Sequence, residues 1–110
     1  MTDTKGLDRW LIHPVRLLIV AFLTDYQWRD FAEVCTALEA MPWRVTTHLS
    51  KLRAAGYVES RLESRKSKIR LTPTGCDRLT EHVTAMQTLT ERAAEFIADA
   101  VESVKGTSST

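Results

Sequence analysis

The stretch of sequence that decides the fold reads PWRVTTHLSKLRAAGYV and covers residues 42–58. Pro42 suits the first position of a helix, where its missing N–H costs nothing and its φ is already helical. Val45, Leu49 and Leu52 follow at the spacing of one helix face, and Gly56 supplies a C-terminal stop. The pattern predicts a helix over residues 42–55.

The face of this helix opposite the apolar stripe is basic and rich in hydrogen-bonding groups. Each residue turns a helix by about 100°, so Arg44, Thr47 and Lys51 fall nearly opposite Leu49. These side chains suit duplex DNA, because Arg fits a guanine edge and Thr fits the methyl group of thymine. The candidate DNA-contacting residues of the helix are Trp43, Arg44, Thr46, Thr47, His48, Ser50 and Lys51.

Two members of this set each allow two interpretations. Trp43 suits packing on the sugar-phosphate backbone of DNA, and equally a contact that holds the turn before the helix. His48 lies on the shoulder of the helix, where it packs at the edge of a helix pair or reaches the groove. Arg53 comes out near the apolar stripe, so its stem is expected to pack against the protein.

A second helix is expected just before this one, over residues 30–39. Asp30 is a suitable N-cap, and Glu33 follows three residues later, as in a capping box. The apolar stripe of this helix includes Cys35, whose thiol is expected to point inward. Together with residues 42–55, this helix completes a helix-turn-helix.

A β-hairpin is expected after the helix-turn-helix. Residues 57–62 and 68–72 predict two short strands, with apolar positions at Val58, Leu62, Ile69 and Leu71, and a polar tip over residues 63–67 joins them. The resulting hairpin, residues 57–72, forms a wing. Its candidate DNA-contacting residues are Arg61, Arg65, Lys66 and Lys68.

Both ends of the chain have a helical pattern. Residues 7–23 predict a short first helix and a second one, with Pro14 at the bend. Apolar steps of three and four residues predict a helix over residues 74–104, about 45 Å long. One small domain cannot cover that length, so the same helix of a second copy is expected to do so. The candidate dimer-interface residues are Leu7, Trp10, Leu11, Leu79, Val83, Met86, Leu89, Ala93, Phe96 and Ile97.

The fold class expected from these elements is mainly α with a small β-hairpin: a winged helix-turn-helix with a long C-terminal dimerisation helix. The chain has 110 residues, 44% of them hydrophobic and 26% charged, which fits one folded domain. We place that domain at residues 1–104 and expect a disordered tail over residues 105–110.

The positive charge of the chain is confined to its middle third. Residues 42–73 carry eight Lys or Arg against two Asp or Glu, although the whole chain has a net charge of only +1. Residues 1–41 have four against six and residues 74–110 three against six, so both flanks are acidic. A basic segment between acidic flanks is typical of a nucleic-acid contact, since a merely soluble surface mixes its signs.

Other function classes find little support in the sequence. Residues 1–4 lack the start of a signal peptide, and the densest apolar run, residues 17–23, is too short to span a membrane. We therefore expect a cytoplasmic protein with no membrane partner. A phosphate-binding Gly-rich loop, a nucleophile beside a His and a set of metal ligands are not evident, so no enzyme, cofactor or metal is expected.

The segments His13–Leu17, Thr46–Val58 and Leu71–Gly75, taken together, resemble the winged helix DNA-binding domains related to the bacterial MarR and ArsR regulators. The likeness spans roughly residues 10–85. It implies that the 42–55 helix enters the major groove, the wing reaches toward the adjacent minor groove, and the first and last helices form a dimer. Metal sensors among such regulators carry paired cysteines in the helix before the recognition helix. Here Cys35 is alone, so the non-metal-binding type is expected.

The function expected from the sequence is sequence-specific binding of double-stranded DNA by a homodimeric transcription regulator, a repressor acting on an inverted-repeat operator. A different class of function stays open, in which the winged helix docks on an acidic protein instead of DNA. A sensor that responds to an unknown small-molecule effector, or to oxidation of Cys76 in the first turn of the last helix, also stays open.

Overall fold

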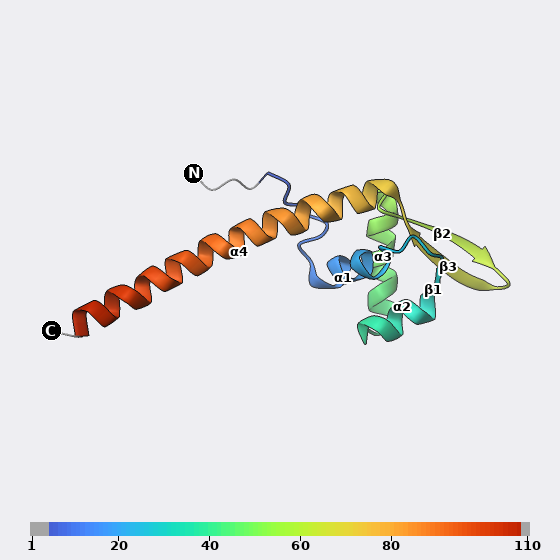
Figure 1. Ribbon diagram of the computed structural model, residues 1–110. Helices are drawn as coiled ribbons and strands as arrows, with labels where there is room; N and C mark the ends of the chain where they lie inside the picture. The colour runs from blue at the N-terminus through green and yellow to red at the C-terminus, as the bar shows by residue number, and fades with distance from the viewer. Residues whose placement is uncertain (1–4, 109–110) are drawn as a thin grey trace.

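The computed structural model describes residues 5–108 and shows a small globular part at one end of a long helix (Figure 1). The molecule measures 72 × 27 × 21 Å, because most of the long helix projects away from the rest. Its elements, in chain order, are α1 (Pro14–Phe22), β1 (Arg29–Asp30), α2 (Phe31–Leu38), α3 (Pro42–Ala54), β2 (Val58–Glu63), β3 (Lys66–Leu71) and α4 (Pro73–Ser108). The predicted winged helix class is confirmed.

The ends of α3 follow the sequence signals. Pro42 is its first residue, as predicted. At the other end Gly56 has a φ of +83°, which favours glycine because it has no Cβ. Its N–H donates to the carbonyl of Arg53 at 3.0 Å, and the N–H of Tyr57 donates to that of Leu52 at 2.9 Å. This pair of hydrogen bonds is a Schellman motif, which satisfies the last carbonyls of the helix.

The predicted N-cap of the preceding helix is also confirmed. Asp30 precedes α2, and its N–H donates to the carboxylate of Glu33 at 3.4 Å. Cys35 is half-buried and packs against the core, and burial raises the pKa of its thiol.

The wing is an antiparallel hairpin in which β2 pairs with β3 from Val58↔Leu71 to Glu63↔Lys66. Ser64 and Arg65 form a two-residue turn, and both have a positive φ, 50° and 65°. The tip is therefore tighter than the five residues predicted from the sequence.

A third strand, β1, was missed because it has only two residues. It lies on the outer side of β3, with Arg29 opposite Ile69 and Asp30 opposite Lys68. The sheet order is β1-β3-β2. This strand attaches the wing to the segment that leads into α2.

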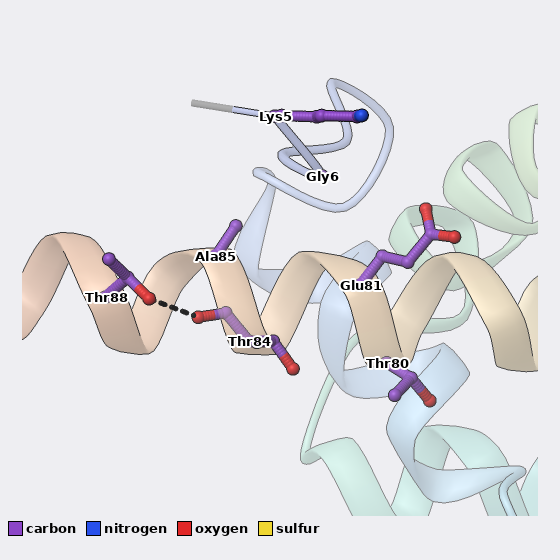
Figure 2. A pocket seen from close by; sticks show the side chains of 7 residues that line it. All are labelled: Lys5, Gly6, Thr80, Glu81, Thr84, Ala85 and Thr88. Atoms are coloured by element: carbon purple, nitrogen blue, oxygen red, sulfur yellow. Dashed lines mark hydrogen bonds between the residues drawn. The ribbon is translucent and has the colours of Figure 1, made fainter. Parts of the chain in front are cut away.

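The first helix predicted within residues 7–23 is wrong, and α1 alone forms there. The N–H groups of Leu11 and Ile12 both donate to the carbonyl of Asp8, so the chain makes a single turn. The Asp8 carboxylate accepts the N–H of Trp10 at 2.8 Å, and such a local bond competes with a helix. Residues 5–13 form an irregular segment that lies across α4, with Gly6 close to Ala85 and Glu81 (Figure 2).

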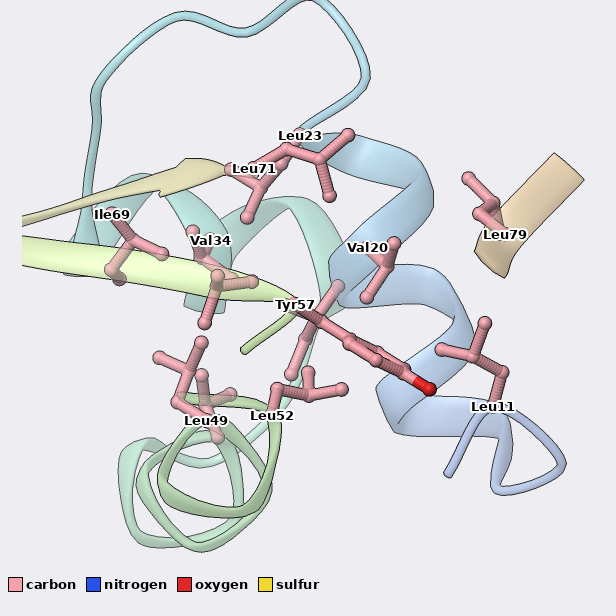
Figure 3. Close-up of a cluster of buried hydrophobic side chains, with 13 residues drawn as sticks. Leu11, Val20, Leu23, Val34, Leu49, Leu52, Tyr57, Ile69, Leu71 and Leu79 are labelled. Atoms are coloured by element: carbon pink, nitrogen blue, oxygen red, sulfur yellow. The ribbon is translucent and has the colours of Figure 1, made fainter. Parts of the chain in front are cut away.

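One hydrophobic core holds the globular part together (Figure 3). Its buried residues are Leu11, Ile19, Val20, Leu23, Val34, Val45, Leu49, Leu52, Tyr57, Val58, Ile69, Leu71 and Leu79. Leu11 is 0% exposed and Leu79 is 7% exposed. Both were predicted at the dimer interface, and this is a correction: they face the core of their own chain. Leu7 and Trp10, from the same predicted set, are half-buried.

The first turn of α4 crosses the turn after α3 at very short range. The Thr72 hydroxyl donates to the carbonyl of Gly56 at 2.7 Å and accepts the N–H of Gly75 at 3.0 Å. The Thr72 N–H donates to the carbonyl of Tyr57 at 3.1 Å. A Cβ at Gly75 would overlap that same carbonyl oxygen, so only glycine fits there.

A buried polar network fixes the N-terminal segment to the same crossing. His82 of α4 is fully buried, and its Nδ1 accepts the N–H of Asp8 at 2.9 Å. The Asp8 carboxylate in turn accepts a hydrogen bond from the hydroxyl of Tyr57. Burial and this hydrogen bond raise the pKa of Tyr57 to about 12. The network joins three segments that are far apart in sequence.

The long helix extends beyond its predicted end at residue 104, because α4 continues to Ser108. The predicted tail therefore begins inside the helix. No proline interrupts the backbone hydrogen bonds there, and one glycine costs a helix only about 1 kcal/mol. Residues 109 and 110 of that predicted tail lie outside the described residues. None of the helices in residues 5–108 combines the length and hydrophobicity that crossing a membrane requires.

Replacing Gly75 with alanine should lower the free energy of unfolding by about 3 kcal/mol, because the new Cβ meets backbone that cannot move aside. Gly56→Ala is the matched control. Nothing lies within 4 Å of its Cβ position, so only the left-handed conformation is penalised, by about 1–2 kcal/mol. Urea denaturation of both variants measures this order. A smaller loss for Gly75→Ala than for Gly56→Ala would contradict the proposed close crossing.

Candidate nucleic-acid interface

The outward face of α3 presents most of the predicted contact residues to solvent. Its inward residues Val45, Leu49 and Leu52 are buried in the core, which orients the helix. The exposed predicted residues are Trp43, Arg44, Thr46, Thr47, Ser50 and Lys51. The Thr47 hydroxyl donates to the carbonyl of Trp43 at 2.9 Å, which leaves its methyl group and oxygen lone pairs for a partner.

His48 is the exception, and its prediction as a DNA contact is corrected here. The side chain turns inward and is only 8% exposed. Its ring lies against that of His13, with the ring centroids 4.2 Å apart. The turn of the helix explains this, because His48 is next to the buried Leu49. Packing, the first of its two interpretations, is the one observed.

The charge on α3 is entirely positive. The helix carries Arg44, Lys51 and Arg53 and no acidic residue. Within residues 5–108, none of these three cations forms an ion pair. Arg44 and Lys51 lie seven residues apart on the outward face, and two unpaired cations on one exposed helix face attract phosphate groups.

Arg53 is a residue that sequence reasoning assigned to packing, although its side chain is exposed. It lines a hollow of about 260 Å³ between α3 and the wing. The hollow is lined by Phe31, Thr46, Leu49, Ser50, Arg53 and Ser67. The sequence does not reveal this hollow, because it forms only where Ser67 of β3 comes close to α3 in the folded chain. The hollow connects the helix face with the hairpin in one continuous surface.

The four cations predicted on the wing divide into two pairs. Arg61 forms an ion pair with Glu63 at 2.7 Å, and Lys68 forms one with Asp30 at 2.5 Å. The hydrogen bond between Lys68 and Asp30 lowers the pKa of the carboxyl and raises the pKa of the ammonium group. These two cations therefore stabilise the wing, a role that the sequence alone does not reveal.

The remaining two wing cations are exposed at the tip. Arg65 lies in the two-residue turn, and it has no ion-pair partner in the described part of the chain. Lys66 is 69% exposed and 4.0 Å from the Asp30 carboxylate, a weak contact. The tip thus presents two positive charges to a partner.

Trp28 holds the base of the wing, and the sequence alone gave no signal for this role. The guanidinium groups of Arg61 and Arg70 lie 4.2 and 4.4 Å from the centroid of its ring. Arg70 also forms an ion pair with Glu59 at 2.5 Å. Cation–π contacts of this kind fix the hairpin relative to the segment before β1.

The family comparison decides what kind of domain this is. A model of the family described as "Winged helix DNA-binding domain" matches residues 15–90. The chain belongs to this winged helix family. The resemblance stated from the sequence is thereby confirmed. No curated protein matches the chain in sequence.

Solved structures show the same winged helix fold. YusO from Bacillus subtilis is 18% identical, with a TM-score of 0.66 over 88% of this chain and 75% of that one. A transcriptional regulator homologue from Pyrococcus horikoshii OT3 is 20% identical, with a TM-score of 0.72 over 78% and 89%. MepR of S. aureus, solved as a complex with DNA, is 16% identical, with a TM-score of 0.65 over 91% and 86%. At these identities the likeness shows the fold alone.

Other candidate sites in the winged helix offer less chemistry. Within residues 5–108, no group of three or more His, Cys, Asp or Glu side chains is placed to hold a metal ion. A hollow of about 490 Å³ lies between the N-terminal segment and α4 (Figure 2). The hydroxyls of Thr80 and Thr88 on its wall donate to carbonyls of α4 and so offer no proton to a ligand there.

Stability should depend on pH through His48. Burial, helped by His13 and the nearby cations, lowers the pKa of His48 below its ordinary value of 6.5. His48 in the folded state therefore binds a proton less readily than in the unfolded state. The stability that the neutral side chain contributes is lost as the pH falls. We expect the free energy of unfolding to fall between about pH 7 and about pH 5, and to fall less in His48→Leu. Urea denaturation at both pH values measures this, and equal losses in the two proteins would contradict it.

Proposed function

We propose that the chain is a sequence-specific, double-stranded-DNA-binding transcription regulator that acts as a homodimeric repressor on an inverted-repeat operator. The observation that carries this proposal is the outward face of α3, whose exposed cations Arg44 and Lys51 form no ion pair within residues 5–108. Membership of a DNA-binding domain family supports it. The MepR structure, a complex with DNA, shows that a protein of this fold binds DNA.

In this proposal α3 enters the major groove and the wing follows the backbone toward the minor groove. Arg44 suits a guanine edge, and the methyl group of Thr47 suits thymine. Lys51, Arg53 and Arg65 contact phosphates, which fix the register of the protein on the duplex. The set of residues proposed to contact DNA therefore leaves out Arg61 and Lys68, which form ion pairs within the protein, and adds Arg53.

The exposed apolar residues of α4 support the homodimer. Phe96 is 65% exposed, Ile97 64%, Val101 50% and Val104 68%. Exposing a group of large apolar side chains to water is unfavourable, and such a group marks an interaction site. A second copy would cover it and present a second α3 to the next half-site, about one helical turn of DNA away. Repression would follow from occupation of a promoter. We further propose that residues 1–104 form one folding unit, since α4 shares the single core.

A protein-docking function is the second candidate. Met41 and Trp43, at the start of α3, are 62% and 66% exposed, and exposed apolar side chains also suit a protein partner. The two functions differ in salt dependence, because DNA binding releases counterions from the phosphates.

Arg44→Ala combined with Lys51→Ala should weaken binding to a duplex DNA fragment about tenfold or more, since each contact contributes about 1–3 kcal/mol. The slope of log affinity against log salt should also become shallower by about one for each phosphate that the variant no longer neutralises. Fluorescence anisotropy over a salt series measures both quantities.

The matched control is Arg78→Ala combined with Lys105→Ala, which removes the same two charges from α4. It should bind the fragment nearly as tightly as the wild type. Equal binding by the α3 variant and the wild type would mean that this face does not contact DNA.

Ile97→Asp should dissociate the dimer, because it places a charge in the apolar contact. We expect the dimer dissociation constant to rise about a hundredfold. Thr88→Asp is the control, because it adds the same charge on the opposite face of the helix. Sedimentation of both variants measures the effect, and an unchanged dimer in Ile97→Asp would remove this face from the interface.

A further inference from the structure

One face of α4 carries no charge over more than twenty residues. Between positions 82 and 104, the charged side chains all lie on the other side of the helix: Glu91, Arg92, Glu95, Asp99 and Glu102. The uncharged face has alternating steps of three and four residues, the spacing of a coiled-coil contact. We call it the seam, and its residues are Val83, Met86, Thr90, Ala93, Ile97, Ala100 and Val104.

The seam has two unlike halves. Before it begins, Leu79 and His82 are buried against the chain's own domain. Val83 is 38% exposed and Met86 is 41% exposed, and they are the first seam residues that a partner can reach. From position 90 to position 105 every residue is exposed, so the distal half projects from the domain.

We propose that two copies pair their α4 helices antiparallel, with Met86 of one facing Ile97 of the other and Thr90 facing Ala93. The proposal rests on the homodimer proposed above and adds its orientation and register. The distal half of each helix then lies on the domain-proximal half of the other. The contact covers positions 83–100 of each copy, about 25 Å of helix.

Burial along the seam selects this register. The seam residues occupy two positions of each heptad, a and d. In an antiparallel coiled coil each a residue faces a d residue of the partner, so the allowed registers differ by seven residues. A shift one way sets Ile97 against Leu79, which is only 7% exposed and already used in the core. A shift the other way places Val83 opposite a position beyond Val104, where the seam has ended.

A hollow beside α1 favours the antiparallel orientation. It has a volume of about 500 Å³ and lies between α1 and α4, where its wall includes Leu17, Val83 and Met86. His82 also lines it, and the buried Nε2 of this side chain has no hydrogen-bond partner in the described chain. In the proposed register, positions 93–100 of the second copy lie over this hollow. A parallel pair would instead set two such hollows against each other and leave Phe96 far from both.

The charges favour the same orientation. Residues 91–105 carry four acidic and two basic side chains, a net charge of −2. Antiparallel pairing keeps the acidic distal halves of the two copies at opposite ends of the contact. A parallel pair brings the two acidic halves together.

Disulfide cross-linking tests the orientation directly. In a Cys35→Ser, Cys76→Ser background, we would add Val83→Cys and Ala100→Cys, which the register places face to face. Disulfides form only when the Cα atoms are within about 7 Å. Under mild oxidation most of this double variant should become a covalent dimer on a non-reducing gel. Val83→Cys alone and Ala100→Cys alone should stay monomeric on the gel, because like positions do not meet.

The matched control is Thr88→Cys with Glu95→Cys, which the register places at the same level but on the opposite face, so it should not cross-link. Cross-linking by Val83→Cys alone would show a parallel pair and overturn the orientation. Cross-linking by Val83→Cys with Ala93→Cys in place of Ala100→Cys would overturn the register. Both results would leave the homodimer and its DNA binding intact. A monomer in sedimentation, by contrast, would overturn the homodimer itself. Circular dichroism checks that each variant is folded.

Discussion

The fold of this protein depends on the crossing of α4 over the turn that ends α3, where the two backbones come close together. Gly75 allows the contact, and Thr72 fixes it through hydrogen bonds to Gly56 and Tyr57. The Asp8 network adds a second attachment at His82, one turn farther along the helix beyond Leu79. Because these contacts involve backbone atoms and the buried side chains of Tyr57 and His82, we expect α3 and α4 to move as one unit.

This unit of α3 and α4 determines how the surface proposed to bind DNA is presented. The wing is attached to the crossing at both ends, since β2 begins after Tyr57 and β3 ends at Leu71. Asp30 and Trp28 hold its outer side. Any contact between two α4 helices therefore fixes the distance between two α3 helices, as well as their orientation. The spacing of half-sites that a dimer reads would follow from the register of a helix pair far from the DNA.

The elements set by local signals could be predicted from the sequence. The start, the buried face and the end of α3 are set by local signals, namely Pro42, the apolar stripe and Gly56. These signals determine which face of α3 points outward, whatever the rest of the fold. The elements set by distant partners could not. β1 exists only because β3 lies beside it. The segment around Asp8 is not helical, because Asp8 forms hydrogen bonds with His82 and Tyr57. The same reason explains the wing, where Arg61 and Lys68 are occupied by neighbours that only the folded chain brings near.

The central claim is that two copies read duplex DNA symmetrically through the exposed face of α3. Selection of bound sequences from a random duplex library tests it most directly, with the affinity of the enriched pool then followed against salt concentration. The account predicts a two-fold symmetric motif whose half-sites lie about 10 base pairs apart, bound with an affinity that falls steeply as salt rises. An unenriched pool, bound weakly and without that salt dependence, would contradict it.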